Sequence, residues 1–148
     1  MSSRAMMPLV LSGRMDNLGD SLSALRKYVG DVSQEAGLAT QAIHRLRLAV
    51  DEVAANIIMY GYAESEQPGV VEVTVTVDDE NLTLVVEDTG KPYNPLERNV
   101  PDNLEDPLDT REIGGLGIYL AIRNVDGFDY QRANNRNRNT FVMKRRPA

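Results

Sequence analysis

The amino-acid sequence predicts an α+β fold, a two-layer α/β sandwich in which helices pack on one face of a mixed, largely antiparallel sheet. Segments with the two-residue apolar period of a strand come mostly in adjacent pairs, as the arms of hairpins do. Segments with a helical period stand apart, and the regular β-α-β alternation of a doubly wound sheet is absent. The 148 residues fit a single domain, 1–148, with a core of its own.

The composition of the chain excludes several classes of protein. The absence of cysteine excludes disulfides, thiol nucleophiles and cysteine metal sites. A net charge of −6 argues against nucleic-acid binding, because such affinity depends on a basic surface. No segment approaches the ~20 apolar residues that a membrane span needs. We therefore expect a soluble, cytoplasmic protein with no nucleic-acid and no membrane partner.

The first part of the chain predicts a strand and a helix. Residues 7–15 predict a short strand. Proline is tolerated in a strand only at its start or at a sheet edge, so Pro8 must occupy one of these places. Residues 16–37 predict an amphipathic helix that Asp16 caps and Gly37 ends. The apolar positions of this helix, spaced by three and four residues, are Leu18, Leu22, Leu25, Val29 and Val32.

A second helix and a hairpin follow. Residues 40–60 predict a helix, and residues 61–69 predict a loop because they contain proline and glycine. The alternation of valine with polar residues over 70–77 predicts a half-buried strand, and 82–88 predicts its hairpin partner. The core positions of the helix are Leu46, Val50, Val53 and Ile57.

The last third of the chain contains a long irregular segment. Residues 90–113 hold four of the seven prolines and many charges, and such a loop in a compact domain is usually a functional lid or disordered. A third helix is predicted at about 115–124, and 128–146 predicts a closing hairpin with a polar turn.

Three glycines, Gly114, Gly115 and Gly117, lie at the entrance of the third predicted helix. Glycine costs about 1 kcal/mol relative to alanine inside a helix, so the cluster indicates a local requirement for bare backbone. One explanation is a flexible hinge. The other is a phosphate cradle, in which a ligand reaches backbone N–H groups and the positive end of the helix dipole. The glycines alone do not decide between these two explanations.

Two further places could carry chemistry. Glu52 and Asn56 lie one helical turn apart beside the core stripe, where a carboxylate could accept a proton and an amide oxygen could hold Mg²⁺. The pair could equally be an ordinary polar flank of a helix. Asp88 ends a predicted buried strand and could accept an N–H from a purine amino group, while Gly90 would let a flat ring approach. An ordinary Asp-Thr-Gly turn explains these residues as well.

The order of these motifs resembles the Bergerat ATP-binding fold, the histidine-kinase-like ATPase fold shared by gyrases and histidine kinases. The matching segments are "LRLAVDEVAANIIMYGY", "VVEDTGKPYNP" and "GGLGIYLAI", which begin at residues 46, 85 and 114. More narrowly, the chain resembles the single-domain anti-sigma factor serine/threonine kinases of bacterial partner-switching systems. The resemblance covers essentially the whole chain, and it favours the phosphate cradle over the hinge.

The resemblance implies a role for each matching residue. Glu52 would be the general base, and Asn56 would coordinate the Mg²⁺ that bridges the phosphates of ATP. Asp88 would bind the adenine amino group, with Gly90 beside the ring. The backbone amides that would bind the phosphates are those of Gly114, Gly115, Leu116 and Gly117.

Further roles implied by the resemblance fall on the segments around these motifs. Residues 91–113 would form the ATP lid, and Arg111 at its end would stabilise charge on the γ-phosphate. Thr140 would support the adenine site. Members of the family often carry a histidine where this chain has Tyr60.

The implied function is an ATP-dependent protein serine/threonine kinase. It would phosphorylate a serine or threonine of a small antagonist protein (an anti-anti-sigma protein), sequester a sigma factor or similar client, and form a homodimer. The alternative is a non-catalytic, nucleotide-gated protein-binding module.

Overall fold

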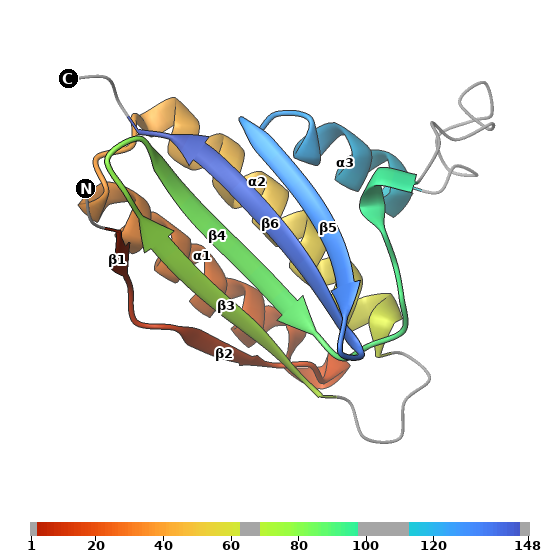
Figure 1. The fold of residues 1–148 in the computed structure, drawn as a ribbon. Coiled ribbons are helices and arrows are strands. Elements are labelled where there is room, and N and C mark those ends of the chain that lie inside the picture. The colour runs from red at the N-terminus through yellow and green to blue at the C-terminus, as the bar shows by residue number, and fades with distance from the viewer. Residues whose placement is uncertain (1–2, 63–68, 98–112, 146–148) are drawn as a thin grey trace.

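The computed structural model describes residues 3–62, 69–97 and 113–145. Helices α1 (Leu18–Glu35), α2 (Thr40–Asn56) and α3 (Ile113–Ile122) form one layer behind a six-stranded sheet (Figure 1). The predicted α+β sandwich is confirmed. The strands are β1 (Arg4–Ala5), β2 (Leu9–Ser12), β3 (Val70–Val77), β4 (Asn81–Asp88), β5 (Gly127–Ala133) and β6 (Arg136–Lys144).

The sheet has the order β1-β3-β4-β6-β5, and β2 also pairs with β3. Each of these pairings is antiparallel. Because side chains alternate across a strand, each strand has an inner face toward the helices and an outer face away from them. On β3, Val73 and Val75 are buried on the inner face, whereas Thr74 and Thr76 are exposed on the outer face. The core therefore lies between the inner face and the helices.

The polar end of this inner face positions the candidate site. Most inward side chains of β4 and β6, such as Leu84 and Phe141, are apolar and fully buried. At the end where β4 finishes and β6 begins, Asp88, Asn137 and Asn139 occupy the inward positions and are also buried. Buried polar side chains need partners, so this end of the sheet requires a polar network.

The structure confirms the predicted core positions of the second helix and the glycine that ends the first, and it corrects two predictions near the start of the chain. The predicted core positions of α2 are all buried, and Gly37 follows α1 with a φ of 78°, as a helix-ending glycine does. The prediction that Asp16 caps α1 is wrong. A 3₁₀ turn, Met15–Asn17, precedes the helix, and the Asp16 carboxylate accepts a hydrogen bond of 3.1 Å from Arg14 instead. Of the predicted strand at 7–15, only β2 (Leu9–Ser12) forms, and it begins directly after Pro8; β1 lies before the predicted range.

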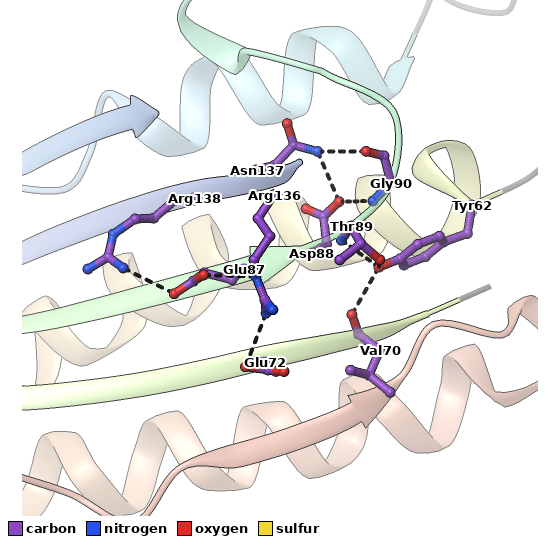
Figure 2. A network of polar contacts seen from close by, with 10 residues as sticks. All are labelled: Tyr62, Val70, Glu72, Glu87, Asp88, Thr89, Gly90, Arg136, Asn137 and Arg138. Carbon is purple, nitrogen blue, oxygen red and sulfur yellow. Dashed lines mark hydrogen bonds and ion pairs between the residues drawn. The ribbon is translucent and has the colours of Figure 1, made fainter. Parts of the chain in front are cut away.

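The end of α2 is fastened to the sheet by Tyr62. After Asn56 the helix continues as a π-helical turn, Ile57–Gly61, and Tyr62 follows it. The Tyr62 hydroxyl donates to the carbonyl of Val70 on β3 (3.0 Å) and accepts the N–H of Thr89 just after β4 (2.8 Å), as Figure 2 shows. One buried side chain therefore joins α2, β3 and the turn that follows β4.

Tyr62→Phe is expected to lower the free energy of unfolding by about 1–3 kcal/mol, because the Thr89 N–H and the Val70 carbonyl both lose a partner. Urea unfolding measures this change. Tyr28→Phe is the matched control, since its hydroxyl donates to the Met7 carbonyl at the surface (2.7 Å) and its loss is expected to cost about 0.5 kcal/mol. Equal losses in the two variants would contradict the role given to Tyr62.

Candidate functional site

The site is built around the carboxylate of Asp88, the last residue of β4. The residue is 1% exposed. Its Oδ1 atom accepts hydrogen bonds from the Gly90 N–H (2.8 Å) and from Nδ2 of Asn137 (3.0 Å), both drawn in Figure 2. Its Oδ2 atom is buried and has no partner within the described part of the chain. A buried acceptor without a partner costs about 1–3 kcal/mol, so Oδ2 is suited to a hydrogen-bond donor on a ligand.

The surroundings of Asp88 act on its charge in two directions. Burial raises the pKa of the carboxyl group above its usual range, because a charge is costly away from water. The hydrogen bonds from Asn137 and Gly90 and the positive charges of Arg132 and Arg136 oppose this rise in pKa. These groups therefore offset part of the free-energy cost of holding the ionised carboxylate away from water.

Gly90 lies in a place that admits no side chain. A Cβ atom there would lie 2.8 Å from the carbonyl oxygen of Gly61 and 3.0 Å from Oδ1 of Asp88. The end of the π-helical turn after α2 thus approaches the turn after β4 too closely for any residue other than glycine. This contact explains the glycine by packing, while its place beside an adenine ring stays a prediction.

The predicted base and the glycine-rich helix lie together. A Cβ atom on Gly117 of α3 would lie 3.1 Å from Oε2 of Glu52, so the missing side chain lets the helix approach this carboxylate. Glu52 and Asn56 are both half-buried near the end of α2. Burial raises the pKa of Glu52, and the negative charge of Asp51 raises it further. A raised pKa makes a carboxylate a better proton acceptor near neutral pH.

The remaining residues that are predicted to bind phosphate are placed only in part. Gly114, Gly115 and Leu116 lie at the start of α3, which begins two residues earlier than expected. The structure describes the backbone of these residues as helical but not the exposure of the residues or the side chain of Leu116. The first four N–H groups of any helix have no partner within the helix, which makes them available to an anion. Arg111 and residues 98–112 of the predicted lid also lie outside the described residues.

The structure does not bring Thr140 and Asp88 together. Thr140 lies on β6 opposite Val85 and Asp129, and the strand alternation places it on the outer face, whereas Asp88 points inward. Asn137 and Asn139 share the inner face with Asp88, and sequence reasoning missed both. Their signal was the alternation of "RNRNTFVMK", in which both asparagines fall in step with the buried Phe141 and Met143 of the same strand.

Asn139 adds a second free acceptor to this end of the sheet. The residue is 2% exposed, and its Oδ1 atom has no partner within the described ranges. The hydroxyl of Tyr93, on the segment after β4, is likewise buried without a partner there. Unpartnered polar atoms on these neighbouring segments indicate a site that a polar ligand completes.

The described residues can be tested for a metal site and a membrane span. No three acidic or histidine side chains among them gather as a metal site would require. Mg²⁺ keeps several waters and binds phosphate oxygens, so a single protein ligand such as Asn56 fits this ion. Of the helices placed by the structure, none has the length and apolar character to span a bilayer.

Comparison with known proteins places the chain among ATPase domains. Residues 16–144 match the family described as "Histidine kinase-like ATPase domain". The serine-protein kinase RsbW of Bacillus licheniformis is 27% identical over 105 residues, which cover 69% of this chain and 65% of that protein. RsbW of Staphylococcus epidermidis is 24% identical over 116 residues, covering 76% and 73%. The chain thus spans less than two thirds of the Bacillus licheniformis relative.

Solved structures are similar in fold. A Mycobacterium tuberculosis protein, in a structure of its RsbU and RsbW domains, matches with a TM-score of 0.62 and 18% identity over 97% of this chain and 34% of that one. The histidine kinase domain of a blue-light activated histidine kinase from Erythrobacter litoralis matches with a TM-score of 0.50 and 16% identity, covering 85% and 60%. At these identities the likeness establishes the fold alone.

Asp88→Asn is expected to keep or raise the free energy of unfolding at neutral pH, by about 1 kcal/mol, because the amide has the same shape and no buried charge. The pKa of Asp88 is higher in the folded than in the unfolded chain. Its favourable contribution to stability is therefore complete below the unfolded pKa and is lost as the pH rises through the folded pKa. Urea unfolding over a pH series should show the advantage of the variant vanishing in acid.

Asp78→Asn is the matched control for this prediction. Backbone N–H groups of Asn81 and Glu80 lower the pKa of the exposed Asp78, so its contribution to stability is present at neutral pH and is lost in acid. The control variant is expected to lose stability at neutral pH. If Asp88→Asn lost stability in the same way, the Asp88 carboxylate would be a stabilising group and the interpretation above would be wrong.

Proposed function

The chain belongs to the histidine kinase-like ATPase domain family, as its motifs predict, and on that premise we propose that it is a protein serine/threonine kinase that uses Mg-ATP. The observation that carries this proposal is the buried Oδ2 of Asp88 at the end of a central strand, an acceptor without a partner among the residues that the structure describes. The similarity to two proteins named serine-protein kinase supports the reaction type.

Each part of ATP would meet a suitable group of the protein. Oδ2 of Asp88 would accept an N–H of the adenine amino group. Backbone N–H groups of Gly114, Gly115 and Leu116 would bind the phosphates at the start of α3, where the helix dipole favours negative charge. The N–H of Gly117, the fifth residue of α3, lies beyond the first four, so its phosphate contact stays a sequence prediction. When bound beside Asn56, Mg²⁺ would neutralise charge on the phosphates. Arg111 and Thr140 stay sequence predictions.

Phosphoryl transfer asks mainly for positioning and charge neutralisation, and this site supplies both. Glu52 would accept the proton of the attacking serine or threonine hydroxyl. As the hydroxyl oxygen bonds to the γ-phosphorus, the bond from that phosphorus to the bridging oxygen breaks and ADP leaves. The raised pKa of Glu52 suits this role, because a base is most effective when its pKa lies near the working pH.

The partners belong to the proposal as well. We propose that the substrate is a small antagonist protein, that the client is a sigma factor or a similar protein, and that the kinase is a cytoplasmic homodimer. The names of the RsbW relatives support the kinase, while the identities of substrate and client depend on experiment.

A second function has one observation in its favour. The network around Asp88 extends to the chain that follows β4, because Asn137 binds both the Asp88 carboxylate and the carbonyl of Lys91. Nucleotide could therefore alter this segment and select a protein partner with no phosphoryl transfer, provided that it binds two conformations with different affinity. Measurements of transfer separate this binding module from the kinase.

Asp88→Asn is expected to abolish saturable binding of Mg-ATP, because an amide nitrogen would face the donor of the adenine base. Thr140→Val is the matched comparison, since Thr140 lies on the outer face and its loss is expected to leave the affinity within about twofold. Calorimetric titration of wild type and both variants measures the affinities. Absence of binding to the wild type would end the kinase proposal, and a large loss in Thr140→Val would restore that residue to the adenine site.

Glu52→Gln is expected to bind Mg-ATP normally and to lose transfer to the antagonist by about a hundredfold or more, because the amide accepts no proton. Transfer of labelled γ-phosphate measures the effect. Asp31→Asn, which changes an exposed carboxylate of α1 paired with Lys27 (2.8 Å), is the matched control and is expected to retain transfer. Full transfer by Glu52→Gln would remove Glu52 from the role of base, whereas absence of transfer by the wild type would favour the binding module.

A further inference from the structure

Asn137 is the most completely bonded side chain of the polar cluster. It lies on β6 directly opposite Asp88 on β4 and Arg132 on β5, and only 3% of its surface is exposed. Its Nδ2 atom donates to Oδ1 of Asp88 (3.0 Å) and to the carbonyl of Lys91 (2.9 Å), with the carbonyl of Gly90 at 3.4 Å. Figure 2 shows this amide between the carboxylate and the turn after β4.

The other half of the same amide is also occupied. Its Oδ1 atom accepts the hydroxyl of Tyr130 on β5 and the backbone N–H of Tyr93 (3.4 Å). An asparagine side chain offers two N–H groups and two acceptor positions, so Asn137 has no hydrogen-bonding capacity left for a ligand. Asp88 and Asn139, by contrast, each keep an oxygen with no partner in the part of the chain that the structure describes. Asn137 therefore holds other groups in place and does not itself form a hydrogen bond to a ligand.

Asn137 holds groups from two parts of the candidate site. One is the Asp88 carboxylate, whose Oδ1 it occupies, while Oδ2 has no partner among the described residues. The other is the chain from Gly90 to Tyr93, which leaves β4 at this point. Arg132 strengthens the second attachment, because its guanidinium donates to the Gly90 carbonyl (2.8 Å).

We propose that Asn137 is a positioning residue of the nucleotide site, which fixes the Asp88 carboxylate with Oδ2 toward the ligand and couples it to the conformation of residues 90–93. This inference rests on the proposed function, since it assumes that Asp88 receives a donor of the nucleotide base.

The residue type matters at this position. Leucine has a similar size but no donor, so it would leave the Lys91 carbonyl and the Tyr130 hydroxyl without their partner and free the Asp88 carboxylate to turn. Aspartate would place a second negative charge at the 3.0 Å contact with Asp88. Only an amide of this length donates to both oxygens while it accepts from two donors.

Asn137→Leu tests the inference by calorimetric titration with Mg-ATP over a pH series. We expect the affinity to fall about tenfold or more at neutral pH, because a hydrogen bond to a charged group is lost. We also expect affinity to be lost at a higher pH than in the wild type when the solution is acidified. The Asn137 amide lowers the pKa of Asp88, and the two positive charges that also lower it, Arg132 on the inner face and Arg136 on the outer face, are unchanged in the variant.

A second readout tests the coupling to the chain after β4. Hydrogen exchange of a peptide spanning residues 89–97 reports on the Tyr93 N–H, which Asn137 binds. Mg-ATP is expected to slow this exchange in the wild type, and in Asn137→Leu the effect of Mg-ATP is expected to be lost. Asn81→Leu is the matched control, because Asn81 lies at the far end of β4 from Asp88 and should leave the affinity and the pH profile unchanged.

The outcomes separate the possibilities. Wild-type affinity in Asn137→Leu, or a uniform loss of affinity with no change in the pH profile, would overturn the inference. If the wild type itself bound no Mg-ATP, the proposed function would fail first. If Asn137→Leu did not fold, Tyr130→Phe removes only one hydroxyl from Asn137 and is expected to lower the affinity about threefold with the same direction of pH change. No change in Tyr130→Phe would then overturn the inference.

Discussion

The buried carboxylate of Asp88 is the constraint on which the surrounding structure depends. A charge that is 1% exposed is stable only if other groups compensate for the water that it loses. The Gly90 N–H and the Asn137 amide do this on one oxygen, and Arg132 and Arg136 contribute positive charge. These requirements explain why the inner face of the sheet, apolar over most of its length, becomes polar at the end of β4.

The outer face at the same end of the sheet carries a different kind of network. Arg136 pairs with Glu72 of β3 and with Glu87 of β4, both at 3.1 Å, and Arg138 pairs with Glu87 at 3.1 Å (Figure 2). Pairs this exposed contribute about 0–1 kcal/mol each, so their main effect is on geometry. They hold the ends of β3, β4 and β6 in register, which keeps Asn137 opposite Asp88 on the inner face.

The sequence predicts the parts of this structure that depend on local pattern. The alternation of valines defines β3, and the helical spacing of apolar residues defines the core face of α2, because both follow from which face is buried. The cap at Asp16 failed because Arg14 takes the carboxylate and a 3₁₀ turn delays the helix. Asn137 and Asn139 were missed because polar residues near a turn resemble exposed ones; their alternation with Phe141 and Met143 carried the signal, and the pairing with β4 places them on the inner face. Contacts between distant segments, such as Glu52 beside Gly117, have no signal in the spacing of either segment.

The backbone of Lys91 links the part of the candidate site around Asp88 to the part around Glu52 and Asn56. Its carbonyl accepts from Asn137, the residue that also holds Asp88 (2.9 Å), and its N–H donates to the carbonyl of Gly61 (3.4 Å). Gly61 ends the π-helical turn that continues the helix of Glu52 and Asn56, and such turns are frequent at functional sites. The helix that carries Glu52 is therefore joined through Gly61 to the N–H of Lys91. Strand β6 is joined to the carbonyl of the same residue through Asn137, which also binds the Asp88 carboxylate. A displacement of α2 or of β6 would strain one of these hydrogen bonds to Lys91. The conformation of the chain that follows β4 therefore depends on the positions of both elements.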